Sequence, residues 1–407
     1  RGKMQSDEFG YLQNENRRNR YFVMKKYTAV FAALMIILNG FTFDAFAQPD
    51  LNLEGSSTLL METRHDQIIY RENEDKRRLP ASVTKIMTVA TAFDIINEKN
   101  IPMDTFVSIS ENAAKIKGAR IKVFKGEMLT LDSLISAIVI NSANNASVAL
   151  AEYLAGSEAE FVKLMNIKAD EMGLEDTNFV SCNGLTLSSR HYSTALDIAQ
   201  IALELIEEGD ILRYSSIKEK DIIIYKGPEM PVRRIKLEST NRLLGEYEGI
   251  DGMKTGWMGP ESGYCFVGTA QMDGTRLLSV TLGAQEKDGN FRDTVKMMDY
   301  GFGDFRYLTL MEKNQEAGSA RVEGSFRKVR GILKDDLVIY GNFEEGEYST
   351  EAVFDELELP IKEGQKIGTL YVYGKDKIVH QVELVSKSDV SRSWIFVLAD
   401  RIKSLLS

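Results

Sequence analysis

The chain has 407 residues, enough for two or three domains. Hydrophobic residues make up 43% of it and charged residues 27%, which is typical of a globular protein that buries a core. A net charge of -10 argues against nucleic acid as a partner, while two cysteines and three scattered histidines predict neither a disulfide framework nor a metal site.

The first 47 residues predict an upstream segment and a signal peptide. Two lysines follow Met24, which we expect to be the true start, and residues 27–43 form a mostly apolar core before the cleavage signal Ala45-Phe46-Ala47. The core is short for a membrane span, so we expect an exported mature chain that begins near Gln48. An uncleaved membrane anchor is the alternative.

Two predicted strands, at residues 58–61 and 68–70, lead into a predicted helix that begins at Pro80. Ser82 and Lys85 are three residues apart, so both side chains fall on one face of this helix. A buried lysine has a lowered pKa and can accept the proton of a neighbouring serine hydroxyl. A serine and a solvated lysine at this spacing are nevertheless common, so the pair needs support from other motifs.

Helical periodicity dominates the following hundred residues, and two polar segments interrupt it. Residues 141–145 lie inside the apolar stretch 131–154, where polar groups need a partner or a cleft to face. A loop that joins two helices explains them equally well. The second polar segment, residues 183–193, is also a predicted loop, and we expect its histidine, His191, to be structural.

Strand patterns replace the helices from residue 221. Lys254-Thr255-Gly256 begins a strand region, and residues 263–270 and 277–283 predict a hairpin joined at Asp273-Gly274. A helix at 292–300 follows. Together these elements predict an α+β fold, in which an antiparallel sheet with helices carries an additional helical lobe.

The remaining residues predict a different structure. A polar segment at 310–320 is expected to be a linker, and residues 321–386 show the short alternating strands of a small all-β domain. Apolar residues from Trp394 onward fall on one helical face, which favours an amphipathic helix at a membrane interface, although a helix docked on its own protein is the alternative. The predicted parts are therefore the upstream segment and signal peptide at 1–47, the catalytic domain at 48–308, the β-rich domain at 309–387 and the terminal helix at 388–407.

Three motifs carry a family resemblance, and they occur in the order Ser82-x-x-Lys85, Ser142-Ala143-Asn144 and Lys254-Thr255-Gly256. This set is the signature of serine β-lactamases and penicillin-binding proteins. On these motifs the chain resembles the D-alanyl-D-alanine carboxypeptidases, which are the low-molecular-weight penicillin-binding proteins of bacterial cell walls. Further matching stretches are Ser193-Thr194-Ala195, Thr240-Asn241, Asp251-Gly252-Met253 and Gly263-Tyr264-Cys265.

The resemblance implies a catalytic group of three side chains. Ser82 attacks the carbonyl of the penultimate D-alanine and forms an acyl-enzyme, with Lys85 as proton acceptor. Ser142 relays a proton toward the leaving amine. The fold implied is a β-lactamase/transpeptidase-like domain.

The resemblance also implies how the substrate is held. Asn144 hydrogen-bonds Lys85 or the substrate amide, and Lys254 with Thr255 holds the terminal carboxylate. Gly256 lets the substrate backbone approach closely, and the backbone N–H groups of Ser82 and Trp257 form the oxyanion hole.

The implied substrate is the peptidoglycan pentapeptide, from which the enzyme removes the terminal D-alanine without a metal or cofactor. β-Lactams are implied covalent inhibitors, and the implied location is the cell wall or the outer face of the cytoplasmic membrane. A DD-endopeptidase acting on cross-links remains an alternative that the motifs barely discriminate, and a catalytically dead wall-binding protein is a further one. A class A β-lactamase is disfavoured, because no asparagine from Asn145 to Asn241 has a glutamate four residues before it.

Overall fold

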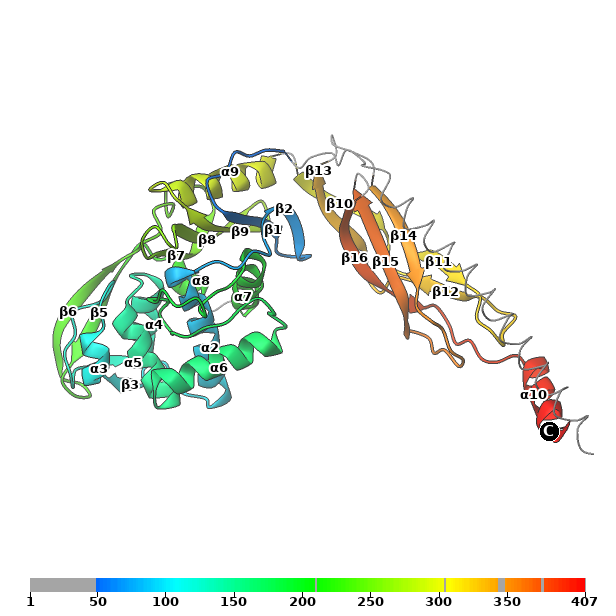
Figure 1. The fold of residues 1–407 in the computed structure, drawn as a ribbon, viewed down its shortest axis with the longest axis horizontal. Coiled ribbons are helices and arrows are strands. Elements are labelled where there is room, and N and C mark those ends of the chain that lie inside the picture. The colour runs from blue at the N-terminus through cyan, green and yellow to red at the C-terminus, as the bar shows by residue number, and fades with distance from the viewer. Residues whose placement is uncertain (1–48, 209–210, 304, 343–347, 375–376, 407) are drawn as a thin grey trace, which may run out of the picture. The chain divides into compact units, whose positions relative to one another are not determined.

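The computed structural model describes residues 49–208, 211–303, 305–342, 348–374 and 377–406 (Figure 1). The predicted signal peptide and everything before it lie outside the described residues. No helix among the described residues is long and apolar enough to cross a membrane.

The central element is a five-stranded antiparallel sheet in the order β2-β1-β9-β8-β7 (Figure 1). The first two strands join the later ones because β1 pairs with β9. The predicted turn between β8 and β9 is confirmed, since Asp273 and Gly274 both adopt positive φ angles as a tight hairpin turn requires. β7 is an edge strand and carries Lys254-Thr255-Gly256. The strands are β1 Ser57–Glu62, β2 Gln67–Glu72, β7 Ile250–Trp257, β8 Tyr264–Met272 and β9 Thr275–Ala284.

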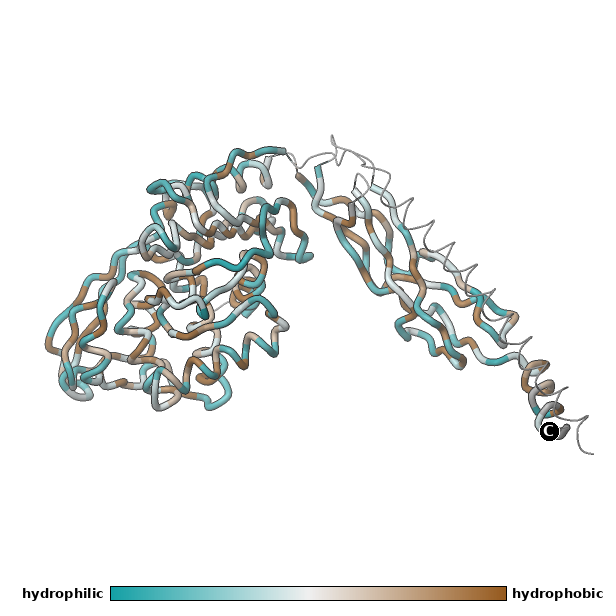
Figure 2. Tube along the Cα trace, viewed as in Figure 1, coloured by the Kyte–Doolittle hydropathy of each residue, from teal (hydrophilic) through white to brown (hydrophobic). Residues whose placement is uncertain are grey.

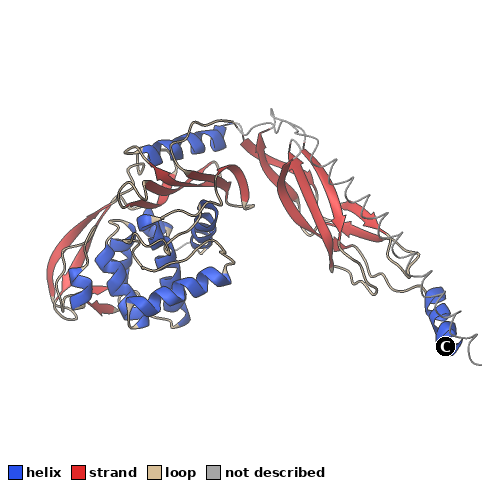
Figure 3. Cartoon of the chain, in the orientation of Figure 1, coloured by secondary structure: helices blue, strands red, loops and turns tan. Residues whose placement is uncertain are grey.

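Helices cover both faces of this sheet (Figure 3). Helix α9 packs on β8 and β9, and α7 packs on β9 and β1 from the helical lobe. Helix α2 contacts α4, α5, α6 and α7, and nearly all its side chains are buried, as expected for a helix that is apolar all round. The lobe contains α2 Lys85–Glu98, α4 Leu131–Val139, α5 Asn144–Ala155, α6 Glu158–Glu171 and α7 Ala195–Glu207, while α9 spans Gly289–Gly303.

A second, four-stranded sheet in the order β3-β4-β5-β6 flanks the lobe. The two longer strands confirm the strand patterns predicted from residue 221 onward. The two short strands have only three residues each, which is too few to show an alternating pattern. The elements are β3 Phe106–Ser108, α3 Glu111–Lys115, β4 Met128–Thr130, α8 Leu212–Ser215, β5 Glu219–Tyr225 and β6 Pro231–Glu238.

The C-terminal β domain has its own hydrophobic core, which includes Val329, Ile339 and Leu384. One sheet has the order β11-β12-β16-β15-β14, and β10 pairs with β13. Figure 2 shows apolar and polar stretches alternating along these strands. The strands are β10 Phe305–Met311, β11 Glu316–Ala320, β12 Val329–Ile332, β13 Leu337–Asn342, β14 Tyr348–Phe354, β15 Lys366–Gly374 and β16 Lys377–Ser386, and helix α10 follows at Trp394–Leu406.

The predicted linker at 310–320 is wrong, because β10 ends in this segment and β11 lies within it. Its glycine has a packing role: a Cβ on Gly318 would lie 3.1 Å from the Cβ of Ala352 and 3.4 Å from the ring of Phe354. A small polar stretch can thus be a strand when a bulky side chain covers it.

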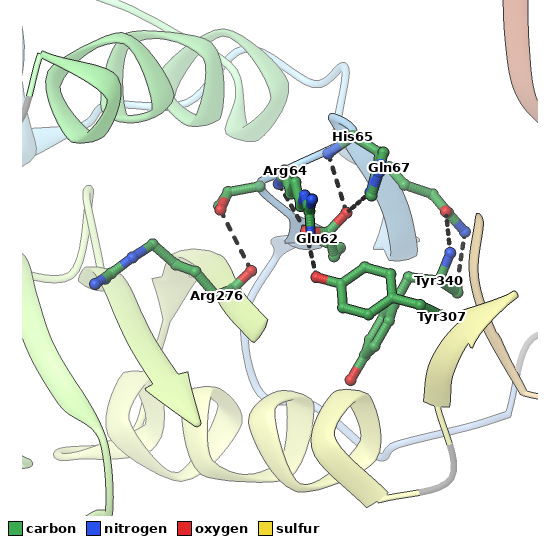
Figure 4. Close-up of polar contacts among 8 residues, drawn as sticks. Glu62, Arg64, His65, Gln67, Arg276, Tyr307 and Tyr340 are labelled. Carbon is green, nitrogen blue, oxygen red and sulfur yellow. Dashed lines mark hydrogen bonds and ion pairs between the residues drawn. The ribbon is translucent and has the colours of Figure 1, made fainter. Parts of the chain in front are cut away.

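The end of β1 and the start of β2 contact strands β10 and β13 of the β domain (Figure 4). The Gln67 side chain donates to the carbonyl of Tyr340 at 2.6 Å and accepts from its N–H at 2.8 Å. The hydroxyl of Tyr307 donates to the fully buried carboxylate of Glu62 at 3.1 Å. A buried carboxylate therefore contributes to the contact between β1 and β10.

Candidate active site

Ser82 and Lys85 meet at the start of α2. Ser82 lies in a short 3-10 turn, Ala81–Thr84, and Lys85 is the first residue of the helix. The Lys85 ammonium lies 2.8 Å from Ser82 Oγ, 2.7 Å from Asn144 Oδ1 and 2.7 Å from the carbonyl of Asn183. The sequence predicts a single helix here, and the structure corrects this: a 3-10 turn, which begins at Ala81 with a φ of +48°, precedes the α-helix and runs directly into it.

The electrostatics of Lys85 favour its role as a base. Its side chain is fully buried, and burial together with the nearby charge of Lys254 holds its pKa well below the usual range. A lowered pKa makes the neutral amine easier to populate, and this is the form that can accept the proton of a serine hydroxyl.

The second motif lies between α4 and α5, where a polar break was predicted. The Asn144 amide has a defined orientation, because its Oδ1 accepts from Lys85 while its Nδ2 donates to the carbonyl of Lys117 at 3.0 Å. Of the two partners considered for Asn144, the structure shows Lys85. Ser142, two residues before Asn144, is buried and has a φ of +59°. Among the described residues, no hydrogen bond joins its hydroxyl to Ser82 or Lys85.

The third motif lies on β7, directly against the nucleophile turn. A Cβ on Gly256 would lie 2.9 Å from the carbonyl oxygen of Pro80 and 3.1 Å from the backbone nitrogen of Ser82. Only a residue without a side chain permits this approach. The three motifs therefore come together in one place.

The other residues of the third motif differ in exposure. Lys254 is 3% exposed, its ammonium donates to the carbonyl of Thr255 at 2.9 Å, and burial lowers its pKa to about 7. The Thr255 hydroxyl donates to Thr240 Oγ1 at 2.6 Å. Trp257 is 58% exposed, and its ring stacks on Tyr264 with 5.8 Å between centroids.

Sequence reasoning gave no role to two residues that support the site. Asn183 supplies the third acceptor for Lys85 through its backbone carbonyl, which no side-chain motif can reveal. Asn241 holds the start of β7, since its Nδ2 donates to the carbonyl of Gly252 at 3.2 Å. The available signals were the Asn183-Gly184 pair in a polar loop and the Thr240-Asn241 stretch that matches the family.

Three carboxylates outside the site, on Asp94, Glu204 and Glu208, lie close enough together to share a cation. The ammonium of Lys168 already occupies this position, because it pairs with Asp94 at 2.7 Å and also with Glu204. The cluster therefore has an internal countercharge.

A serine hydroxyl bonded to a buried lysine, beside an edge strand that carries a second lysine, defines a serine acyl-transfer enzyme of the penicillin-binding class. A family model described as D-alanyl-D-alanine carboxypeptidase matches residues 44–286, more than half of the chain, and a model for the C-terminal domain of penicillin-binding protein 5 matches residues 305–392. The chain therefore belongs to the D-alanyl-D-alanine carboxypeptidase family.

Relatives and solved structures agree with this assignment. The D-alanyl-D-alanine carboxypeptidase DacF of Bacillus subtilis is 32% identical over 90% of this chain and 95% of its own length. Penicillin-binding protein 5 of Haemophilus influenzae matches with a TM-score of 0.69 and 27% identity, over 85% of this chain and 99% of the other. The ampicillin-bound penicillin-binding protein D2 of Listeria monocytogenes matches with a TM-score of 0.55 and 30% identity, over 63% of this chain and 100% of the other. The predicted family, fold class and serine peptidase class are confirmed.

Proposed function

We propose that Ser82 is the nucleophile by which this serine peptidase removes the terminal D-alanine of peptidoglycan pentapeptides. The observation that carries the assignment is the 2.8 Å contact between Ser82 Oγ and the buried ammonium nitrogen of Lys85. Ser82 Oγ attacks the penultimate carbonyl carbon as its proton passes to Lys85. The C–N bond then breaks, and the departing D-alanine amine takes a proton through Ser142. Water hydrolyses the acyl-enzyme in the second half-reaction, and the proton that the water molecule loses returns to the Ser82–Lys85 pair.

The edge strand supports a proposal for how the peptide binds. Among the described strands, β7 pairs only with β8, so its outer edge can hydrogen-bond an extended peptide. Lys254 and Thr255 would hold the terminal carboxylate, because a cation in a water-poor site attracts it strongly. The backbone N–H groups of Ser82 and Trp257 would stabilise the oxyanion, at about 3 kcal/mol for each donor in the transition state.

A fluorescent penicillin tests the nucleophile. We expect a lasting covalent label on the peptide that contains Ser82, no label in Ser82→Ala, and full labelling in the matched variant Ser108→Ala, whose serine is exposed on β3. Rapid turnover of the drug without a lasting label would instead identify a β-lactamase. Digesting cross-linked muropeptides beside pentapeptide separates the endopeptidase alternative.

We also propose that α10 lies on a membrane surface. Trp394 is 73% exposed, and Ile395, Leu398 and Ile402 on the same face are each more than two-fifths exposed, so this face is not docked on the described part of the chain. The opposite side of the first turn is held by the β domain, because the ring of Phe396 packs 5.2 Å from that of Phe326.

Backbone contacts fix this first turn further. The N–H of Ser393 donates to the carbonyl of Gly324 at 2.8 Å, and its hydroxyl accepts from the N–H of Phe326 at 3.1 Å. These contacts leave the apolar face turned away from the loop that holds the helix, as a surface-bound helix requires.

Removing residues 394–407 tests the membrane proposal. A cut before Trp394 keeps Val390, whose backbone pairs with that of Ile361 in the β domain. We expect the truncated mature protein to stop pelleting with phospholipid vesicles while it still releases D-alanine from soluble substrate. Unchanged pelleting would contradict the proposal.

Export rests on the predicted signal peptide. If the chain is exported and cleaved, mass spectrometry of the protein isolated from cells will give a mature N-terminus near Gln48. An N-terminus at Met24 would favour the uncleaved anchor.

A further inference from the structure

His191 lies deep in the protein at the end of the loop between α6 and α7. Its side chain is 1% exposed, and its Nδ1 accepts the backbone N–H of Val180 at 3.1 Å. Since Nδ1 accepts, the proton of the neutral ring resides on Nε2. Nε2 lies 2.9 Å from the hydroxyl oxygen of Thr84 and therefore donates to it.

Thr84 belongs to the nucleophile turn, between Ser82 and Lys85. The same loop contacts this region at two more points through its backbone. The carbonyl of Asn183 accepts from Lys85 at 2.7 Å, and that of Cys182 accepts from the hydroxyl of Thr88 at 2.5 Å. The His191–Thr84 bond joins side chains of the loop and the turn directly.

The contact with Asn183 has a specific use in the reaction. A protonated lysine has three N–H donors, and Lys85 meets three acceptors on Ser82, Asn144 and Asn183. When the amine is neutral it keeps two donors, which Asn144 and Asn183 can hold. The lone pair then points at Ser82 Oγ. A shifted Asn183 carbonyl would turn this lone pair away from the hydroxyl.

We propose that His191 is a positioning residue, which pins the loop to Thr84 and thereby keeps the Asn183 carbonyl on Lys85. This inference rests on the proposed roles of Ser82 and Lys85. His191 touches neither of them and carries no proton in the reaction. Burial lowers its pKa to about 4, so the ring stays in the neutral form that this pair of hydrogen bonds requires.

Two substitutions at this position separate positioning from plain stability. His191→Gln places an amide N–H near the position of Nε2 and keeps the donor to Thr84, but it leaves the Val180 N–H without its acceptor. His191→Asn keeps an acceptor near the position of Nδ1 but is too short to reach Thr84. Each variant loses one hydrogen bond, so both should lose similar thermal stability.

The measurements are the rate of acylation by fluorescent penicillin, kcat and KM for a D-Ala-D-Ala peptide, and the melting temperature. We expect His191→Asn to lower the acylation rate and kcat about 100-fold with little change in KM, since a misplacement of an ångström has effects of this size. His191→Gln should stay within about tenfold of the wild type, since it keeps the Thr84 bond through which positioning acts.

Thr84 provides an independent check that does not depend on whether His191→Asn folds. Thr84→Val should reproduce the loss of acylation, Thr84→Ser should not, and Thr84→Val with His191→Asn should be no worse than either alone. Equal losses of acylation rate in His191→Gln and His191→Asn, or a wild-type acylation rate in Thr84→Val, would overturn the positioning role of His191. Neither result would affect the proposed function. A wild-type label at a residue other than Ser82 would overturn the proposed function as well.

Discussion

Two lysines in the candidate active site are buried, and the proposed mechanism gives them opposite tasks. Lys85 must be neutral to accept a proton, whereas Lys254 must be charged to hold a carboxylate. Burial lowers the pKa of both, and the charge of Lys254 lowers that of Lys85 further. The proposed catalytic form, with neutral Lys85 beside protonated Lys254, requires the pKa of Lys85 to lie below that of Lys254, and the charge of Lys254 acts in this direction.

The pH dependence of kcat/KM follows from this arrangement. It should rise through the lowered pKa of Lys85 and fall above about pH 7 as Lys254 loses its proton. The arginine in Lys254→Arg keeps its charge at all working pH values. The alkaline limb of the pH profile should therefore disappear in this variant, even if its rate is lower. An alkaline limb that is unchanged in Lys254→Arg would assign it to another group.

The burial of Lys254 also has a cost in stability. Its folded pKa of about 7 lies below the ordinary 10.5, so the unfolded chain binds more protons between these values and stability rises with pH across this window. Lys254→Met should therefore stabilise the fold by a few kcal/mol at pH 6, since each unit of pKa shift corresponds to on the order of 1.4 kcal/mol. Near pH 10 the gain in stability should be much smaller.

Urea denaturation at both pH values measures this gain. The exposed Lys334 provides the control, since Lys334→Met should change the free energy of unfolding little at either pH. A destabilised Lys254→Met at pH 6, with native packing, would contradict the buried charge.

At the scale of elements, the loop that carries Asn183 and Gly184 shapes the site as much as the helix does. Gly184 has a φ of +77°, and a Cβ there would lie 1.9 Å from the carbonyl oxygen of Ala81. The loop therefore touches the nucleophile turn through backbone atoms that no larger residue could bring so close.

Gly173 makes a matched comparison for this contact. It also has a left-handed conformation, with φ +71°, but a Cβ there would meet nothing within 4 Å. Gly173→Ala should cost about 1 kcal/mol through backbone strain alone. Gly184→Ala should cost several times more and should slow labelling of Ser82, as thermal denaturation and fluorescent penicillin can show. Equal costs at the two positions would contradict the close contact.

Local patterns predicted the elements that depend on nearby residues. The predicted polar break at 141–145 overlaps the point where α4 has ended at Val139 and α5 begins at Asn144, and Asp273-Gly274 turns β8 into β9. Patterns failed where distant residues decide: Phe354 covers Gly318 and makes a strand of a predicted linker, and a loop carbonyl from Asn183 completes the Lys85 site. The residues of the candidate site could be named from the sequence because they belong to motifs, whereas the groups that support them are mostly backbone atoms, which carry no motif.

At the scale of the whole chain, the predicted boundary at 308/309 falls inside β10, which begins at Phe305 and pairs with β13. The sequence gives no sign of this pairing, because its partner lies some thirty residues further on. The matches to two family models, ending at residue 286 and beginning at residue 305, fit a division before β10.

The contact between Glu62 and Tyr307 provides a test at this scale. Tyr307→Phe removes the hydroxyl that donates to a buried carboxylate, so it should lower stability by about 1–3 kcal/mol without changing kcat/KM. Tyr373→Phe removes a hydroxyl that donates to Glu351 at an exposed site and should cost less than about 0.5 kcal/mol. Thermal denaturation of both variants measures these losses of stability. An unchanged stability in Tyr307→Phe would mean that this hydrogen bond contributes nothing.

The most direct test of the central claim is mass spectrometry of the products formed from a peptidoglycan pentapeptide by the mature protein. We predict the loss of one alanine with the wild type and with Ser108→Ala, and no loss with Ser82→Ala. Intact pentapeptide after incubation with the wild type, or full D-alanine release by Ser82→Ala, would contradict the assignment of Ser82 and Lys85 as the reacting pair.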